Sequence, residues 1–324
     1  MNYSLPLLLQ GLEFALSPMA EDAEQHTRQW LRGLGLEVTP KATHQLDIYL
    51  PGKYAGFMWP DADREDLYVL SDLTGWFSCQ DDLADEDLSR APDVLESVLR
   101  KVQRIARDSA PSNCEGLGGG FKDILDRAAR SMPALWRERT LEQYASYLYP
   151  CLHAAHHRMA GTQPTAEDYE SVWRNAGGFQ VCFEFTYFVC RVNLPSTVYY
   201  SAVWQTLRRL SLNLMKAVND LLSFAIMENP DEDVYNLLTH LRHHQSLSPD
   251  QATEEVRQRI EQWVHQFHDV QARLPEELTR LGCDDELCEQ VQRCADALRV
   301  QWLGNIGWHL AVPRYREIRF RPDG

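Results

Sequence analysis

The chain has little positive charge, no closely spaced cysteine pair and no long hydrophobic run. Its 324 residues include 32 Lys and Arg against 47 Asp and Glu, which gives a formal net charge of −15. This charge repels nucleic-acid phosphates and anionic lipid headgroups, so we expect neither as a partner. The apolar runs, such as Tyr187 to Cys190, fall far short of the roughly 20 residues that a membrane-spanning helix needs. We therefore expect no membrane insertion.

The eight cysteines include no C-x-x-C pair, and a chain of this length does not need disulfide bonds to build a core. We expect them to be reduced. The first Lys or Arg is Arg28, so the charged start of a secretory signal is missing. The cytoplasm is therefore the expected compartment.

Hydrophobic residues at 44% and charged residues at 24% are ordinary values for a globular protein. No series of strands is recognisable, and helical periodicity dominates. No long linker or fixed-period repeat divides the chain, so we expect a single all-α domain over 1–324 with helices around a central cavity or core. The predicted helices cover about 20–31, 64–84, 91–108, 118–130, 139–160, 166–191, 198–228, 232–244, 249–280 and 286–310.

An acidic run at the end of an apolar helical stretch is the most informative segment. It reads Phe77-Ser78-Cys79-Gln80-Asp81-Asp82-Leu83-Ala84-Asp85-Glu86. Asp81 and Asp85 are one helical turn apart, and like charges at this spacing destabilise a helix by roughly 0.2–0.5 kcal/mol per pair. A divalent cation would reverse this effect, since carboxylate oxygens are hard ligands suited to Mg²⁺. Taken alone, such a motif is more often a solvated acidic helix end than a metal site.

A second polar cluster follows in the helix predicted over 198–228. Asn219 and Ser223 share one face there, and their side-chain oxygens are potential metal donors. An isolated pair of this kind is more often a buried hydrogen-bonding pair than a metal site.

The two clusters, in this order and about 140 residues apart, resemble the aspartate-rich and N-D-x-x-S-x-x-x-E motifs of bacterial class I terpene synthases. The segment from Trp302 to Trp308 and the following Arg314-Tyr315 resemble the final helix and closing R-Y pair of that family. Arg174, followed by Gly177-Gly178, matches the position of the family's pyrophosphate-sensing arginine before a helix break.

The resemblance implies an all-α terpene cyclase that ionises a linear prenyl diphosphate with three Mg²⁺ ions, for which Mn²⁺ could substitute. The prenyl diphosphate substrate is the implied partner, and a homodimer is compatible with the resemblance. The implied metal ligands are Asp81, Asp82, Asp85, Asn219, Ser223 and Glu228. The implied catalytic residues are Arg174, Gly178, Arg314 and Tyr315, of which Arg174, Arg314 and Tyr315 would bind the diphosphate.

The family's glutamate stands eight residues after the asparagine, where this chain has Met227, and Glu228 follows one residue later. On a regular helix position nine points about 180° away from Asn219, so Glu228 would need a one-residue bulge to reach the site. A frame that starts at Asp220 keeps the spacing to Glu228 but has Phe224 where a hydroxyl is needed. The basic residue that often precedes the glutamate is also absent, and Lys216 is the residue that could replace this diphosphate contact.

After ionisation, aromatic rings would stabilise the carbocation by about 0.5–2 kcal/mol each. Phe77 and Trp308 are the first candidates for the cavity wall, followed by Phe179 and Phe183, and plain core packing is the alternative for each. Farnesyl diphosphate is the first choice of substrate and geranylgeranyl diphosphate the second. A chain-elongating prenyl synthase would carry two aspartate-rich motifs, and this chain has one. A non-catalytic helical binder derived from a synthase is the remaining alternative, prompted by Met227.

Overall fold

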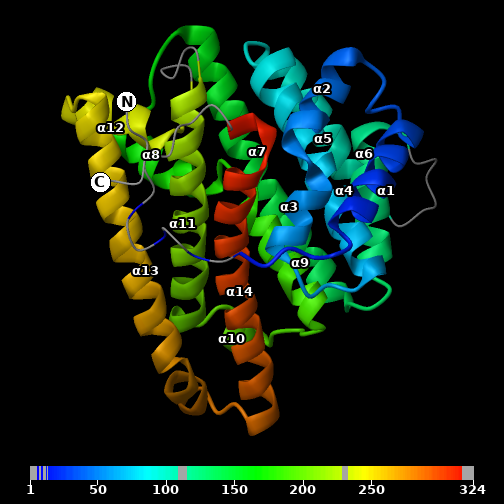
Figure 1. The fold of residues 1–324 in the computed structure, drawn as a ribbon, viewed down its shortest axis with the longest axis vertical. Coiled ribbons are helices and arrows are strands. Elements are labelled where there is room, and N and C mark those ends of the chain that lie inside the picture. Colours follow the sequence, from blue (N-terminus) through cyan, green and yellow to red (C-terminus); the bar gives the residue numbers. More distant parts are fainter. Residues whose placement is uncertain are drawn as a thin grey trace.

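The computed structural model describes Pro6, Leu9, Leu12 and residues 14–108, 115–227 and 233–315. Every regular element among them is a helix, which confirms the predicted all-α fold (Figure 1). The α-helices are α1 (Ala20–Gly33), α2 (Pro40–Tyr49), α3 (Pro51–Met58), α4 (Arg64–Asp82), α5 (Pro92–Arg107), α6 (Gly116–Ala128), α7 (Ala134–Ala160), α8 (Ala166–Val172), α9 (Phe179–Cys190), α10 (Ser196–Tyr199), α11 (Ala202–Ile226), α12 (Leu237–Gln245), α13 (Pro249–Arg280) and α14 (Asp285–Ala311). A π-helical turn, η2 (Leu83–Asp87), and two 3₁₀ turns, η3 (Trp173–Asn175) and η5 (Pro313–Tyr315), complete them.

The short helices α2 and α3 are the elements that the sequence analysis did not predict. Pro40 and Pro51 stand in their first turns, where a missing N–H costs no helical hydrogen bond. Leu50 separates the two helices with a left-handed backbone, φ 56°. Because each helix is short and ends against a proline or an irregular residue, its periodicity is too brief to recognise in the sequence.

The stretch predicted as one helix over 166–191 is α8, the 3₁₀ turn η3 and α9. Gly178 separates the last two with φ 66°, a conformation that favours glycine. A Cβ at this position would lie 2.9 Å from Cε1 of Phe77, so the glycine also allows close contact with α4.

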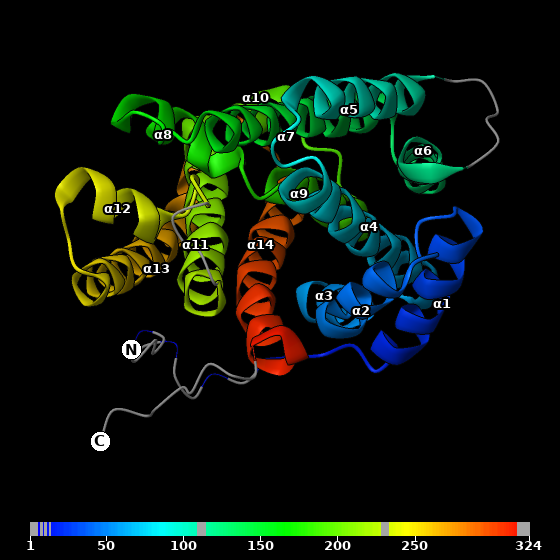
Figure 2. The same cartoon turned by 90° about the horizontal axis from the view of Figure 1, so that it is seen from above.

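Seen from above, α11 and α14 lie beside each other, α5 and α7 run along one edge, and α1 to α4 lie on the other side of α14 from α11 (Figure 2). Helix α14 packs against α3, α9, α11 and α13, so it is central to the bundle. Trp76, Trp136 and Trp204 are among the largest fully buried side chains of the core. This arrangement brings helices from both halves of the chain around one interior space.

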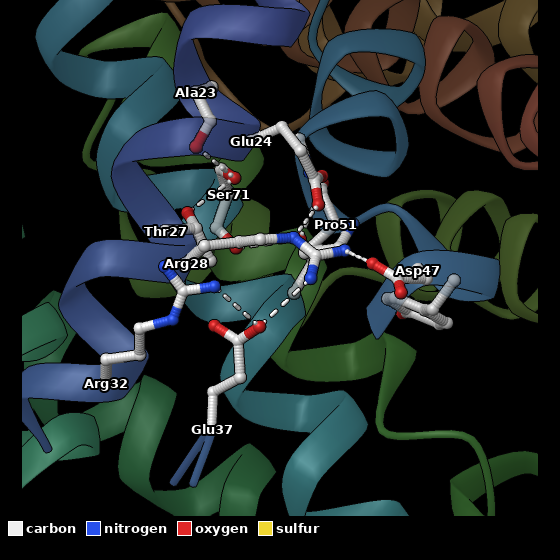
Figure 3. Close-up of polar contacts among 12 residues, drawn as sticks. Ala23, Glu24, Thr27, Arg28, Arg32, Glu37, Asp47, Pro51 and Ser71 are labelled. Atoms are coloured by element: carbon white, nitrogen blue, oxygen red, sulfur yellow. Dashed lines mark hydrogen bonds and ion pairs between the residues drawn. The ribbon is translucent and has the colours of Figure 1, made fainter. Parts of the chain in front are cut away.

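Arg28 of α1 holds the N-terminal helices in place (Figure 3). Its guanidinium binds Glu24 at 2.9 Å, Glu37 at 3.0 Å and Asp47 of α2 at 2.9 Å. The second oxygen of Glu24 accepts a 2.7 Å hydrogen bond from the backbone N of Gly52 in α3. The network therefore fixes α2 and α3, which contribute Tyr49 and Tyr54 to the interior.

Gly304 of α14 allows that helix to approach α3 closely. A Cβ there would lie 2.0 Å from the carbonyl oxygen of Phe57 and 2.9 Å from Cα of Met58, both backbone atoms that cannot rotate away. The same pair of helices brings the rings of Tyr54 and Trp308 within 4.5 Å. Gly304 therefore sets the spacing of one wall of the interior.

We predict that Gly304→Ala destabilises the fold by about 1–3 kcal/mol, because α14 and α3 must separate to admit the methyl group. Gly33→Ala is the matched control, since a Cβ at Gly33 meets no atom within 4 Å. Urea unfolding measures both, and the control should be neutral or stabilised by up to about 1 kcal/mol. Equal stabilities for the two variants would contradict the packing argument.

Candidate active site

A cavity of about 470 Å³ lies among α3, α4, α7, α9, α11 and α14. This volume is within the range of about 300–1,000 Å³ that is usual for small-molecule sites. Its lining combines two kinds of side chain, carboxylates and aromatic rings. The carboxylates are Asp81, Asp82, Asp85, Glu86 and Asp233, and the rings are Tyr49, Tyr54, Phe77, Tyr147, Phe179, Tyr235, Trp308 and Tyr315.

Most of the predicted site residues come together here. The cavity is lined by Phe77, Asp81, Asp82, Asp85, Gly178, Phe179, Lys216, Asn219, Ser223, Trp308, Arg314 and Tyr315. Arg174 and Phe183 do not line it, and Glu228 lies outside the described residues.

The acidic run spans the end of α4 and the turn after it. The helix continues from Asp82 into the π-helical turn η2, and such turns occur frequently at functional sites. Asp85, within this turn, forms a 2.7 Å ion pair with Nη2 of Arg158 from α7. Arg158 also lines the cavity, and no sequence motif pointed to it.

The carboxylates of Asp81 and Asp82 are crowded by neighbouring carboxylates in the cavity lining. Burial, followed by the charges of Asp85 and Asp82, raises the pKa of Asp81 to about 7. Burial and the charge of Glu86 raise the pKa of Asp82 to about 6. The Tyr147 hydroxyl donates a 3.2 Å hydrogen bond to Oδ1 of Asp81, and this bond only partly offsets the cost of the negative charge.

This donor set fits a divalent cation. Among the residues that the structure describes, no group of three or more His, Cys, Asp or Glu side chains could hold a metal alone. Mg²⁺ is usually bound by one or two carboxylates together with water and substrate phosphates, and Asp81 and Asp82 can supply those carboxylates. A cation beside them would stabilise the ionised forms that the cavity now disfavours.

Asn219 and Ser223 line the cavity from the last turns of α11. The Oγ of Ser223 accepts a 3.4 Å hydrogen bond from Nδ2 of Asn236. The helix ends at Ile226, and Met227 is extended with φ −76° and ψ 135°. Met227 itself reaches the cavity, so a thioether stands where the family glutamate is expected. The bulge proposed for Glu228 falls beyond the residues described here.

His309 of α14 orients the Asn219 side chain. The backbone oxygen of Asn305 only accepts hydrogen bonds, so Nδ1 of His309, 2.7 Å away, carries the proton. This leaves Nε2 as an acceptor, 3.3 Å from Nδ2 of Asn219. Burial lowers the pKa of His309 to about 3, which keeps the ring neutral. The amide oxygen of Asn219 is thereby left free for another partner, and a single histidine in an apolar helix gave no signal for this role.

Lys216, predicted to replace a missing diphosphate contact, lines the cavity, but its charge is already paired within the protein. Its ammonium group is buried, forms an ion pair with Asp220 and donates a 2.9 Å hydrogen bond to the Tyr235 backbone oxygen. Asp220 also accepts 2.7 Å and 2.9 Å bonds from Nε1 of Trp173 and the backbone N of Leu237. Both charged residues are therefore committed to the scaffold, which also excludes the motif frame that starts at Asp220.

Arg174 lies in the 3₁₀ turn η3, one turn before the Gly177-Gly178 break. Its Nε donates a 3.2 Å hydrogen bond to Oδ1 of Asn213, and its Nη1 donates one to the backbone oxygen of Glu170. These bonds hold the guanidinium outside the cavity lining. The three residues that follow the turn, Ala176 to Gly178, do line it.

Arg314 and Tyr315, the predicted C-terminal pair, both line the cavity. Tyr315 is 2% exposed and its ring contacts those of Trp308 and His309 at 5.8 and 4.8 Å. The nearby Tyr315 raises the pKa of Arg314 against the effect of burial, and Asp81 and Asp82 contribute in the same direction. Arg314 thus brings a permanent positive charge to the carboxylates of α4.

The aromatic wall is larger than predicted. Phe77 packs edge-on against Tyr147 at 5.6 Å, and Trp308 packs against Tyr49 and Tyr54 at 4.8 and 4.5 Å. The three tyrosines were missed because α2 and α3 were not predicted and because α7 carries aromatic residues on several faces. Phe183 is a core residue instead, fully buried beneath the guanidinium of Arg208 at 5.7 Å, so its assignment to the cavity wall is wrong.

Comparison with known proteins agrees with this site. Residues 72–266 match the family model described as terpene synthase family 2, C-terminal metal binding. Pristinol synthase from Streptomyces pristinaespiralis is 30% identical over 307 residues, covering 93% of this chain and 82% of the relative. A (−)-β-caryophyllene synthase from Saccharothrix espanaensis, named as (2E,6E)-farnesyl diphosphate cyclizing, is 23% identical over 311 residues, covering 95% and 88%. The solved structure of wild-type cucumene synthase superimposes with a TM-score of 0.79 at 23% identity, covering 93% of this chain and 99% of that one.

The chain therefore belongs to the bacterial class I terpene synthases, enzymes of the lyase class that act on prenyl diphosphates. The matched region is the family's metal-binding part, so dependence on a divalent metal follows from it. No helix of the described residues is both long enough and apolar enough to span a membrane.

The raised pKa of Asp81 predicts how stability depends on pH. The folded, metal-free protein keeps protons on Asp81 and Asp82 that the unfolded chain releases near pH 4, so stability falls as pH rises from about 4 to about 7. Asp81→Asn should flatten this decline and be more stable than the wild type at pH 8. Thermal unfolding across this range measures the effect, and identical pH profiles for the two proteins would contradict it.

Proposed function

We propose that the protein is a Mg²⁺-dependent sesquiterpene cyclase that ionises farnesyl diphosphate and cyclises the resulting carbocation. The observation that carries this proposal is a single cavity in which crowded carboxylates and a half-buried arginine adjoin a wall of aromatic rings. The polar part suits a metal-bound diphosphate, and the aromatic part suits a cation that must be kept from water.

The active site would bind three Mg²⁺ ions, for which Mn²⁺ could substitute. When bound, they would neutralise the charge that develops on the departing diphosphate. Asp81 would be the principal ligand on α4, with Asp82 beside it, and Asp85 would support the site through its ion pair with Arg158. Asn219 and Ser223 would bind an ion on α11.

Arg314 and Tyr315 would bind the diphosphate oxygens, because a guanidinium presents fixed donors that match phosphate geometry. Both already line the cavity beside the Asp81 carboxylate. Arg174 stays in this proposal as the diphosphate-sensing residue, although in this structure its donors bind Asn213 and Glu170. A rearrangement of the Gly177-Gly178 break would have to accompany its entry into the site.

Phe77, Tyr147 and Trp308 would stabilise the carbocation through their ring faces, at about 0.5–2 kcal/mol per ring. Their mutual edge contacts fix the rings before substrate arrives, so little reorganisation is needed during the reaction. A hydrocarbon wall around them would exclude water from the reacting carbons.

Farnesyl diphosphate is favoured because a relative that covers nearly the same length is named for cyclising it. Geranylgeranyl diphosphate is the alternative, and the two differ only in the depth of chain that the cavity must hold. We further propose that the whole chain forms one catalytic α-domain, that it acts in the cytoplasm and that it forms a homodimer. The non-catalytic alternative is disfavoured because Asp81, Asn219, Ser223, Arg314 and Tyr315 all reach one cavity.

Turnover tests the proposal directly. The purified protein is incubated with Mg²⁺ and, separately, geranyl, farnesyl and geranylgeranyl diphosphate, and the extracts are analysed by gas chromatography and mass spectrometry. We expect cyclic products from farnesyl diphosphate and a loss of at least about 100-fold in kcat/KM for Asp81→Asn. Asp61→Asn, in an exposed turn between α3 and α4, is the matched control and should retain full activity. No cyclic product from any substrate would contradict the proposal.

The contact between His309 and Asn219 yields a separate prediction. His309→Phe keeps an aromatic ring but removes the acceptor for the Asn219 amide, so the Mg²⁺ concentration for half-maximal rate should rise by about tenfold. The KM for substrate at saturating Mg²⁺ should change little, and His309→Gln should restore part of the Mg²⁺ affinity. A uniform loss of kcat with unchanged Mg²⁺ dependence would show that the histidine acts only through packing.

A further inference from the structure

The metal site on α11 lacks an anionic ligand within the helix. Asn219 and Ser223 are neutral donors, and Met227 takes the place of the expected glutamate with a thioether, a soft group that is a poor ligand for Mg²⁺. A divalent ion held by two neutral oxygens alone would be weakly bound. The structure offers a carboxylate from a different segment.

Residues 233–237, which lead into α12, are fastened onto the turn of α11 that carries Asn219 and Ser223. The Asp220 carboxylate accepts a 2.9 Å bond from the backbone N of Leu237, and Lys216 donates one of 2.9 Å to the Tyr235 oxygen. Nδ2 of Asn236 donates to the backbone oxygen of Asp220 at 2.9 Å and also to Oγ of Ser223 at 3.4 Å. Asn236 is fully buried, so the segment has one defined position.

Asp233 is the residue that this segment presents to the cavity. Its backbone oxygen accepts a 3.1 Å hydrogen bond from the backbone N of Asn236, the same residue that contacts Ser223. Asp233 lines the cavity together with Asn219 and Ser223. One asparagine therefore links the carboxylate-bearing turn to a predicted metal ligand.

We propose that Asp233 supplies the anionic ligand of the metal site formed by Asn219 and Ser223, in place of the carboxylate missing at Met227. The inference rests on the proposed function, because it assigns a ligand to a metal that this function requires. Asp220 and Lys216 are then positioning residues, which hold the Asp233 segment against α11.

The charges around Asp233 are consistent with this role. Burial lowers the pKa of Arg158, but the carboxylates of Asp85 and Asp233 outweigh burial and raise it. The positive charge of Arg158 thus offsets the negative charges of both Asp85 and Asp233 in the metal-free protein. A cation bound at Asp233 would neutralise part of this negative charge, so that Arg158 could also interact with the diphosphate.

The test counts metal ions in the full-length protein with inorganic diphosphate, independently of turnover. Mn²⁺ is titrated in the presence of excess diphosphate and followed by electron paramagnetic resonance, and Mg²⁺-dependent thermal stabilisation is recorded in parallel. Asp233→Asn should bind one ion fewer than the wild type and need at least about tenfold more Mg²⁺ for half-maximal stabilisation. Glu228→Gln and the exposed control Asp61→Asn should match the wild type in both measurements.

Loss of the ion from Glu228→Gln but not from Asp233→Asn would overturn the inference and return the ligand role to Glu228. Equal metal counts for Asp233→Asn and the wild type would also overturn it. If the wild type itself bound neither metal nor diphosphate, the proposed function would fail first, so the two failures are distinguishable. Asp233→Asn keeps the shape of the side chain and every backbone bond of the segment, and its metal-free melting temperature shows whether it folds.

Discussion

Repulsion among the carboxylates at the end of α4 and in the turn η2 is the interaction on which the rest of the site depends. Asp81 lines the cavity beside Asp82 and Asp85, and desolvation there, followed by the charges of Asp85 and Asp82, raises its pKa to about 7. Two arginines, Arg158 from α7 and Arg314 from η5, approach these carboxylates from distant parts of the sequence. They reduce the repulsion without removing it, so the site keeps a strong preference for added positive charge.

The fold places donors for that charge on several helices. Asp81 belongs to α4 and Asn219 to α11, and α14 connects them because it carries His309 against Asn219 and leads into Arg314 and Tyr315. Gly304 allows α14 to contact α3, and this contact brings Trp308 and Tyr54 together as part of the aromatic wall. A bundle of packed helices thus positions metal ligands, diphosphate donors and rings around one cavity.

The sequence was informative where chemistry conflicts with local structure. Aspartates clustered at the end of an apolar helix, and Asn219 and Ser223 on one face of another, stood out because such groups are costly to bury. The ion pair of Lys216 with Asp220, one turn later inside the motif, was not foreseen from the sequence. Phe183 was misplaced because helical spacing gives a face of α9 but not the neighbour that covers it, which is Arg208.

The residues that sequence reasoning could not find are those defined by contacts between distant segments. His309 and Arg158 carry no motif, and their roles arise only when α14 and α7 pack against α11 and the acidic turn. The same holds for Asp233, which reaches the cavity because the buried Asp220 carboxylate binds the segment that follows it. Tertiary packing decides such positions, and local periodicity does not encode it.

A crystal structure of the protein grown with Mg²⁺ and inorganic diphosphate tests the central claim most directly. The account predicts diphosphate inside the cavity, with Mg²⁺ bound by Asp81 and a further ion bound by Asn219 and Ser223, and with Arg314 and Tyr315 contacting the phosphate oxygens. Diphosphate outside this cavity, or inside it without an ion on Asp81, would contradict the account.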